Sequence, residues 1–234
     1  MLKEILKRNL IYRPLEVTAP VRAAVDSLRR DGFPSCPPDE GDLLYLLANA
    51  CPDSRCLEVG FATGSTALYM LAGSKAGSVT SIDYRQSEFD YVGVRAVAQS
   101  GMAGRHKLLE GNSNTLLPEL FRSSQQFDLI FLDGWKTFDH LWVDAYYCNQ
   151  LLALGGVMVF DDTRMPSVDK ALRLLHRYYQ YEEIDGFRLL AWPRLRWWYL
   201  LTTRTYRRPY RVFRKTRRYE DLAVSRDWSY WRNF

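Results

Sequence analysis

The spacing of apolar residues divides the chain into a helical beginning and a longer stretch of alternating elements. Near the N-terminus, Val21, Val25 and Leu28 recur at the spacing of one helix face, so we predict a helical lead-in over residues 1–38. A cluster of prolines ends this lead-in, and a leucine-rich helix is predicted over residues 40–50.

From Arg55 onward, short continuous apolar runs alternate with longer helical segments. We predict strands at residues 56–59, 78–82, 106–109, 127–132 and 157–160. The helices predicted between and after them cover residues 65–71, 88–99, 112–121, 138–152 and 168–179. Apolar strands that alternate with helices are typical of a parallel sheet buried on both faces, and right-handed crossovers make such a sheet doubly wound.

A late antiparallel strand pair is expected to complete this sheet. One member is predicted at residues 188–192, and both 198–203 and 210–216 fit the other. The predicted fold class is therefore α/β, with a Rossmann-like, doubly wound, mostly parallel seven-stranded sheet and helices on both faces. Residues 39–234 are expected to form a single domain.

Composition argues against a membrane-spanning protein and against a disulfide framework. No apolar run approaches the roughly 18 to 20 residues that a membrane-spanning helix needs. Charges through the first turns argue against a secretory signal. The four cysteines form no CxxC pair, which favours reduced thiols. We therefore expect a cytoplasmic protein.

The net charge of +5 is concentrated near the C-terminus. Residues 188–218 interleave many arginines with tryptophan and tyrosine and contain no acidic residue. The simplest interpretation is a closing β-hairpin whose arginines are solvated or contact acidic faces of the same protein or of a homodimer partner. A peripheral contact with an anionic membrane surface or a lipid-linked substrate is a second interpretation. Nucleic-acid binding is the third and the least favoured.

A glycine-containing loop follows the first predicted strand. Gly60 allows a sharp turn and close approach by a ligand, and Gly64 opens the next helix. The GxxxG spacing differs from the GxGxxG that cradles a pyrophosphate, so the loop suits an amino-acid moiety and argues against a dehydrogenase. Asp83 ends the second strand, about 20 residues farther on, where a carboxylate can accept hydrogen bonds from both ribose hydroxyls of a nucleoside.

Polar residues also follow the third strand, at Gly111, Asn112 and Ser113. They suit the adenine end of a nucleoside pocket. They equally suit an N-cap for the helix that follows, and the two roles are compatible.

Three carboxylates follow the fourth and fifth strands, at Asp133, Asp161 and Asp162. Neighbouring parallel strands bring them to one rim of the sheet, where they repel one another unless a cation is bound. Oxygen ligands of this kind suit Mg²⁺ or a similar divalent ion. The alternative without a metal is that Asp162 caps a helix and Asp133 faces the nucleoside ligand.

Two residues near this rim are candidate general bases. Lys136 could accept a proton from a substrate hydroxyl if its pKa is lowered by burial or by a nearby cation, and His140 is the competing base. The residue pattern does not decide between them, and either could instead be a solvated loop residue.

Together these segments resemble the class I methyltransferases, and in particular the O-methyltransferases of the catechol and caffeoyl-CoA type and bacterial relatives that methylate sugars. The resemblance covers roughly residues 39–175. It is carried by Asp39-Glu40-Gly41 before the first strand, the loop LEVGFATGSTAL, Ser81-Ile82-Asp83, LDGWK and FDD. The basic segment 188–218 has no counterpart in the resemblance.

The resemblance implies an O-methyltransferase that uses S-adenosyl-L-methionine and, with assistance from Mg²⁺ or a similar divalent cation, methylates a small-molecule or glycan hydroxyl. It implies Asp133, Asp161 and Asp162 as metal ligands and Lys136 as the base, with His140 as the alternative. The residues expected to bind the methyl donor are Glu58, Gly60, Phe61, Thr63, Gly64, Ser65, Thr66, Asp83, Tyr84, Gly111, Asn112, Ser113 and Asp133.

Two other functions compete with this one. An RNA methyltransferase acting on a base nitrogen usually carries an Asn/Asp-Pro-Pro-aromatic segment after the fourth strand, where this chain has Asp133-Gly134-Trp135-Lys136. A non-catalytic methyltransferase-like binding protein is expected to have a damaged donor loop, whereas Gly60, Gly64 and Asp83 are intact.

Overall fold

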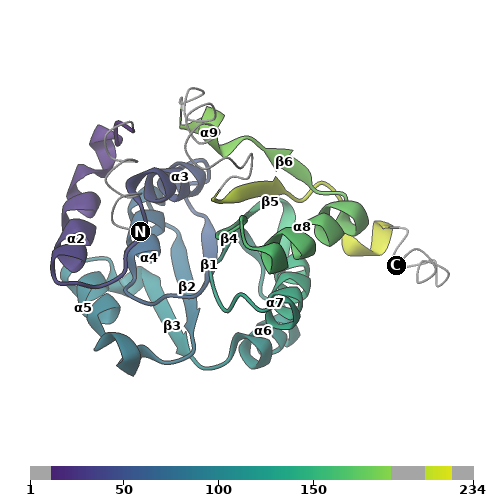
Figure 1. Cartoon of the computed structure of the whole chain (residues 1–234), viewed down its shortest axis with the longest axis horizontal. Coiled ribbons are helices and arrows are strands. Elements are labelled where there is room, and N and C mark those ends of the chain that lie inside the picture. The colour runs from purple at the N-terminus through teal and green to yellow at the C-terminus, as the bar shows by residue number, and fades with distance from the viewer. Residues whose placement is uncertain (1–11, 191–208, 223–234) are drawn as a thin grey trace.

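The computed structural model describes residues 12–190 and 209–222, which contain a seven-stranded sheet (Figure 1). The strands lie in the order β3-β2-β1-β4-β5-β7-β6, and β1 to β5 are parallel while β7 is antiparallel to both of its neighbours. Their bounds are β1 Arg55–Val59, β2 Ser78–Asp83, β3 His106–Glu110, β4 Phe127–Leu132, β5 Leu152–Phe160, β6 Glu182–Ile184 and β7 Arg211–Arg214. The predicted fold class is confirmed.

The described helices include those that the apolar spacing predicts. They are α2 Ala19–Arg30, α3 Pro38–Asn49, α4 Ser65–Gly73, α5 Val92–Gln99, α6 Ser113–Arg122, α7 Phe138–Leu151, α8 Pro166–Tyr179 and α9 Gly186–Leu189. Short 3₁₀ turns lie at Glu16–Thr18, Gln86–Phe89, Ala103–Arg105 and Tyr219–Asp221. In α2 the predicted face of Val21, Val25 and Leu28 is buried.

The predicted helix over residues 88–99 is wrong in its first part. Asp90 and Tyr91 have φ values of 48° and 52°, in the left-handed region, and therefore separate a 3₁₀ turn at Gln86–Phe89 from α5. A helix cannot pass through two such residues because their backbone twists in the opposite sense.

The late strand pair is partly corrected. β7 lies within the predicted range 210–216, but its hairpin partner is β6 at Glu182–Ile184 rather than residues 188–192. Residues 186–189 instead form α9. The β6 pairing is supported by ion pairs that the apolar pattern does not reveal, because Arg211 and Arg214 contact acidic side chains of β6. The alternative at 198–203 lies outside the described residues.

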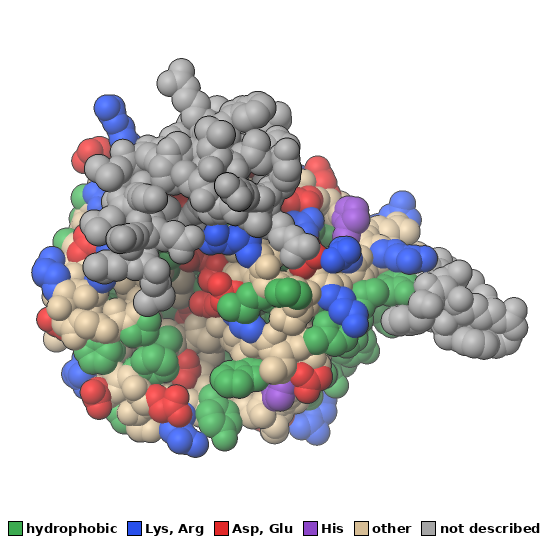
Figure 2. All heavy atoms as spheres, in the orientation of Figure 1, with side chains coloured by type: hydrophobic (Ala, Val, Ile, Leu, Met, Phe, Trp, Pro, Cys, Tyr) green, Lys and Arg blue, Asp and Glu red, His purple; other side chains and the backbone are tan. Residues whose placement is uncertain are grey.

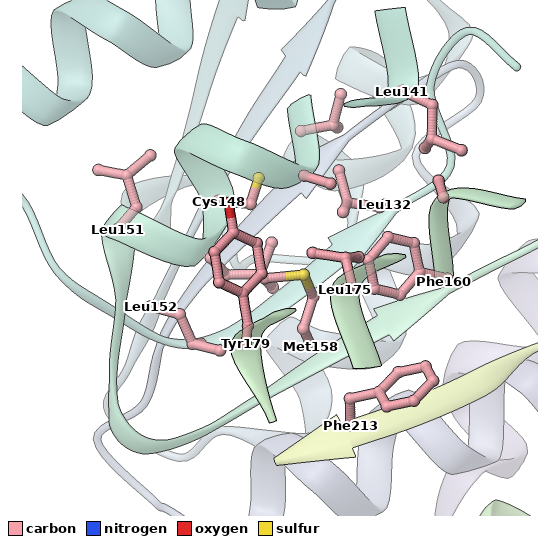
Figure 3. Packing of buried hydrophobic residues seen from close by; sticks show 14 of the residues in the cluster. Leu132, Leu141, Cys148, Leu151, Leu152, Met158, Phe160, Leu175, Tyr179 and Phe213 are labelled. Atoms are coloured by element: carbon pink, nitrogen blue, oxygen red, sulfur yellow. The ribbon is translucent and has the colours of Figure 1, made fainter. Parts of the chain in front are cut away.

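Neighbouring side chains along each central strand enter two different cores, one on each face of the sheet. Cys56 and Leu129 pack with leucines of α3 and α4 and with Val97 of α5, whereas Leu57 and Ile130 pack with α6, α7 and α8. Figure 3 shows the second core, where side chains of α7 and α8 meet Met158 and Phe160 of β5 and Phe213 of β7. This two-sided burial explains why the strands are continuously apolar in sequence.

Among the described residues, no helix combines the length and the apolar character that crossing a membrane requires. Residues 1–11 of the predicted lead-in, and the part of the basic segment at 191–208, lie outside the described residues. The division into a lead-in and one domain at residue 39 stays a prediction.

Candidate functional site

The predicted site residues lie at the carboxyl ends of the central strands. β1 has β2 on one side and β4 on the other, so the strand order reverses beside β1, which is where open α/β sheets bind ligands. On the face of the molecule drawn in Figure 2, acidic side chains gather near the middle.

Gly60 and Gly64 shape the loop after β1. Gly60 has a φ of +97°, and a Cβ there would lie 2.4 Å from the backbone oxygen of Asp133, so no other residue fits without backbone movement. Gly64, with a φ of +72°, is the N-cap of α4, and a Cβ would lie 2.8 Å from the Phe61 ring. The loop is thus pressed against the end of β4.

Asp83 holds this loop from the end of β2. Its Oδ2 accepts hydrogen bonds from the backbone N–H groups of Phe61 (3.0 Å) and Ala62 (2.7 Å), and its Oδ1 accepts one from the backbone N–H of Arg85 (3.1 Å). An ionised carboxylate has about four acceptor positions, so one remains for a ribose hydroxyl. Asp83 therefore has a structural role in addition to its predicted ligand.

Glu58 lies behind the loop, fully buried. It accepts hydrogen bonds from the hydroxyls of Thr66 on α4 and Ser81 on β2, the latter at 2.7 Å. Burial raises the pKa of Glu58 to about 7, although both hydrogen bonds act in the opposite direction. The side chains of Glu58, Thr66 and Ser81 thus tie β1, α4 and β2 together beneath the predicted donor site.

The remaining loop hydroxyls hold a segment that the sequence did not mark as functional. Thr63 donates to the backbone oxygen of Pro34 (2.7 Å), and the Oγ of Ser65 accepts from the backbone N–H of Cys36 (3.0 Å). A cavity of about 190 Å³ lies here. It is lined by Pro34, Ser35, Cys36, Pro37, Glu40, Gly60, Phe61, Ala62, Thr63, Ser65, Thr66, Asp133 and Asp161. From the sequence, the proline cluster before α3 predicts only the end of a helix. The structure shows that Pro34 and Pro37 of this cluster also line the cavity.

Of the two predicted roles of the residues after β3, the geometry shows the helix cap, and the contact with adenine stays a prediction. Asn112 is the N-cap of α6 and accepts from the backbone N–H of Asn114 (2.9 Å), while Gly111 donates to the backbone oxygen of Asp83 (2.7 Å). Ser113 hydrogen-bonds to the buried carboxyl of Asp144. The sequence gives no sign of a role for Asp144, because this residue lies inside a helix and not at the end of a strand.

Tyr84 follows Asp83 and is 64% exposed, with the Arg85 guanidinium 5.4 Å from its ring centre. Its exposure leaves the ring accessible beside the end of β2, where the sequence predicts the nucleoside.

The predicted convergence of three carboxylates is confirmed. Asp133, Asp161 and Asp162 each offer an oxygen, and these oxygens lie within 4.8 Å of one another. Lys136 Nζ lies 2.6 Å from Asp133 Oδ1 and 3.7 Å from Asp162 Oδ2. Burial and the neighbouring carboxylates raise the pKa of Asp133 even though Lys136 lowers it, and burial likewise raises the pKa of Asp161.

The two candidate bases have different surroundings. Burial lowers the pKa of Lys136, but the carboxylates outweigh burial and the pKa is raised, so the lowered pKa required of a base is not produced by these residues alone. His140 lies in the first turn of α7, with its Nδ1 3.1 Å from the hydroxyl of Thr137 and 3.5 Å from a carboxylate oxygen of Asp139. Of these two residues, Lys136 is the one whose side chain forms ion pairs with carboxylates of the cluster.

The donor set fits a hard divalent cation. All three groups are carboxylates, the ligand type that Mg²⁺ prefers, and their oxygens are close enough to share one ion. Asp162, whose carboxylate belongs to this cluster, has a φ of +53°, in the left-handed region that few non-glycine residues adopt.

Comparison with known proteins matches residues 57–163 to a family described as a methyltransferase domain. Tricin synthase 2 of Oryza sativa subsp. japonica is 32% identical over 170 residues, which cover 69% of this chain and 56% of the relative. A caffeoyl-CoA O-methyltransferase of Populus kitakamiensis is 31% identical over 55% of each chain. A catechol O-methyltransferase of Niastella koreensis is 30% identical over 49% of this chain and 53% of its own. The chain thus spans little more than half the length of these relatives.

Solved structures show the same fold at lower identity. An O-methyltransferase from Bacillus cereus in complex with SAH superposes with a TM-score of 0.64 at 15% identity, covering 78% of this chain and 89% of that one. A methyltransferase from Geobacter sulfurreducens gives a TM-score of 0.61 at 16% identity, covering 93% and 98%. The chain therefore shares the fold of these methyltransferase structures, its residues 57–163 match a family described as a methyltransferase domain, and its sequence is similar to O-methyltransferases of the caffeoyl-CoA and catechol type.

Proposed function

We propose that this protein is an S-adenosylmethionine-dependent O-methyltransferase that methylates a hydroxyl of a small-molecule acceptor with the help of a divalent cation. One observation carries the proposal: the glycine loop and the carboxylate cluster are in contact. The space for a side chain at Gly60 is taken by the backbone of Asp133, whose own carboxylate belongs to the cluster. A donor on the loop and an acceptor oxygen at the cluster would then be neighbours.

The protein's contribution to the reaction would be largely positional. The methyl carbon passes from the sulfonium sulfur to the acceptor oxygen, the C–S bond breaks as the C–O bond forms, and the hydroxyl proton leaves. Such an in-line displacement is accelerated chiefly by alignment of the two reactants. Asp83 fixes the loop and receives the ribose, and the wall formed by residues 34–37 encloses the amino-acid end.

The carboxylates of Asp133, Asp161 and Asp162 would hold the cation. When bound, it supplies Lewis-acid polarisation that lowers the pKa of the acceptor hydroxyl. Lys136 is favoured over His140 as the proton acceptor because it contacts the cluster. The carboxylates that raise the pKa of Lys136 are the charges that a cation would offset, which would free the amine to accept a proton.

The first experiment is calorimetric titration of the protein with S-adenosylhomocysteine, with and without Mg²⁺. We expect binding in both conditions. Absence of heat and of a melting shift with this nucleoside and with S-adenosylmethionine would overturn the proposed function.

The second experiment tests the cation. The double variant Asp161→Ala/Asp162→Ala should bind S-adenosylhomocysteine nearly as well as the unmodified protein but lose at least about 100-fold in turnover, measured as S-adenosylhomocysteine release with catechol, phenolic and sugar acceptors. Asp53→Ala, at an exposed carboxylate before β1 and outside the cluster, is the matched control and should keep its activity. If turnover survives both the double substitution and EDTA, the metal-assisted mechanism is wrong.

The acceptor's identity, a homodimer and a membrane contact through residues 188–218 remain predictions. Within the described part of that segment, Arg211 makes a bidentate contact with Glu183 (3.0 and 2.6 Å) and Arg214 lies 3.7 Å from Glu182. These pairs favour the interpretation in which arginines of the segment contact acidic residues of the same chain.

A further inference from the structure

His106 is a partly buried polar residue that neither the sequence motifs nor the proposed reaction uses. It is the first residue of β3, at the end of the strand opposite to the one where ligands bind. Its ring nevertheless contacts two parts of the donor site. One contact is to the loop after β1, and the other is to the hydrogen-bonded group around Glu58.

The first contact is a ring stack with Phe61. The ring centres are 4.9 Å apart with an interplanar angle of 23°, and the Phe61 side chain is only 1% exposed. The Phe61 ring also fills the space that side chains at Gly64 and Gly93 would need, at 2.8 and 2.7 Å from their ideal Cβ positions. The ring is therefore enclosed by the loop, by α5 and by His106.

The position of this ring determines where the loop backbone lies. Asp83 Oδ2 accepts hydrogen bonds from the backbone N–H groups of Phe61 and of the next residue, Ala62. A shift of the ring would move these donors and the carboxylate that is predicted to receive the ribose.

The second contact is a hydrogen bond to Ser81. His106 Nε2 lies 3.0 Å from Ser81 Oγ, and the Ser81 hydroxyl donates to Glu58 Oε2 at 2.7 Å. Since that hydroxyl has one proton and gives it to Glu58, His106 Nε2 carries the hydrogen and donates to Ser81. Burial lowers the pKa of His106 to about 4, so the ring is neutral at physiological pH.

We propose that His106 is a positioning residue for the methyl donor: its ring holds Phe61 and its Nε2–H holds the Ser81–Glu58 pair, so that the loop keeps the shape that binds the nucleoside. The inference rests on the proposed function, since it concerns the same donor. It assigns His106 an effect on donor affinity that exceeds its effect on folding.

The experiment compares substitutions that remove one or both contacts, using S-adenosylhomocysteine as the probe in calorimetry and the melting temperature without ligand as the measure of folding. His106→Ala removes both contacts and should raise Kd at least about ten-fold. His106→Phe keeps an aromatic ring and loses the hydrogen bond, and should raise Kd about three-fold. Leu108→Ala is the matched control, because Leu108 lies on the same strand and packs against the same core. It should lower the melting temperature while Kd stays within about two-fold.

Ser81→Ala separates the two contacts further. If the His106 hydrogen bond acts through Ser81, adding His106→Phe to Ser81→Ala should change Kd by less than about two-fold, because neighbouring effects on one network are not additive. If His106→Ala does not fold, His106→Phe and Ser81→Ala still test the proposal.

Two results would overturn the inference alone: His106→Phe and Ser81→Ala both bind within two-fold of the unmodified protein, or Leu108→Ala weakens binding as much as the His106 variants do. Failure of the unmodified protein to bind S-adenosylhomocysteine would instead overturn the proposed function and this inference with it.

Discussion

The two halves of the candidate site differ in how their polar groups are satisfied. On the side of β1 and β2, the carboxylates of Glu58 and Asp83 already accept hydrogen bonds from the protein, and the hydroxyls of Thr63 and Ser65 are bonded to the 34–36 segment. On the side of β4 and β5, three carboxylates face one another with Lys136 as the cation in contact. The polar groups of the first half are thus paired within the protein, whereas among the described residues the second half sets three carboxylates against one lysine.

This difference matters for how each half would respond to a ligand. A loop that is already held in place costs little conformational entropy on binding. A cluster of like charges destabilises the protein and gains most when a cation binds. The donor half should therefore be sensitive to shape, and the carboxylate half to charge.

The strongest test of the donor half is Gly60→Ala. The added Cβ would lie 2.4 Å from a backbone oxygen, and the φ of +97° is unfavourable for alanine, so we expect a loss of at least about 3 kcal/mol of stability and of measurable S-adenosylhomocysteine binding. Gly155→Ala is the matched control, because Gly155 has a φ of +83° but nothing within 4 Å of its Cβ position. It should cost about 1 kcal/mol in urea unfolding and leave binding intact. Equal losses for the two variants would contradict the close packing of loop and β4.

Glu58→Gln tests the protonation of the buried carboxyl group in the donor half. The pKa of Glu58 is raised from its ordinary value of 4.5 to about 7, so the native state retains a proton that the unfolded chain releases. Stability should therefore fall as the pH rises from 4.5 to 7 and level off above, by up to about 3 kcal/mol from this group. The glutamine variant should lack that part of the fall, which urea unfolding of both proteins at pH 5 and pH 8 would measure.

The control for this pH effect is Glu119→Gln, at an exposed position of α6, which should keep the pH dependence of the unmodified protein. Because the other titrating groups are common to all three proteins, the difference between the slopes isolates Glu58. Identical slopes for the unmodified protein and Glu58→Gln would rule out a proton held by Glu58 in the native state.

The same two halves differ in what the sequence could predict. The alternation of apolar strands and helices predicted the parallel sheet, and the strand ends then predicted that Asp133, Asp161 and Asp162 meet, since parallel strands place their carboxyl ends on one edge. Contacts between elements far apart in the chain gave no comparable signal. The wall at residues 34–37 and the stack of His106 on Phe61 depend on how loops and strands lie in space, which apolar periodicity does not encode.

The prediction of the late hairpin was wrong in one strand for a similar reason. Its strands are short, and ion pairs such as Arg211–Glu183 help to select the register, so apolar runs alone predict residues 188–192 in place of β6. The acidic residues that form ion pairs with these arginines, Glu182 and Glu183, lie just outside the basic segment.

Lys136→Met tests the carboxylate half. The side chain of Lys136 is 18% exposed and its partner Asp133 is 36% exposed, so the loss should lie between that of a surface pair and that of a buried pair, at about 2 kcal/mol. Mg²⁺ should restore part of the lost melting temperature, because a divalent ion can replace the missing positive charge. Lys107→Met, at an exposed position of β3, should change neither quantity. If Lys136→Met is as stable as the unmodified protein and its melting temperature does not change with Mg²⁺, the cluster needs no counter-charge.

The smallest expected effect on stability is at Asp162, where shape and charge can be separated in one residue. Its φ of +53° lies in the left-handed region, which asparagine tolerates well and alanine poorly. Asp162→Asn keeps the backbone and the oxygen ligand but removes one of three repelling charges, so it should gain about 0.5 kcal/mol of stability in the absence of metal. The same substitution should weaken Mg²⁺ binding, because the cluster loses charge that attracts the ion. Asp162→Ala should be less stable than Asp162→Asn by about 1 kcal/mol, since it adds backbone strain to the loss of charge. If asparagine proves as destabilising as alanine while Mg²⁺ binding is unchanged, the excess charge attributed to this half of the site is not there, and the contrast with the donor half disappears.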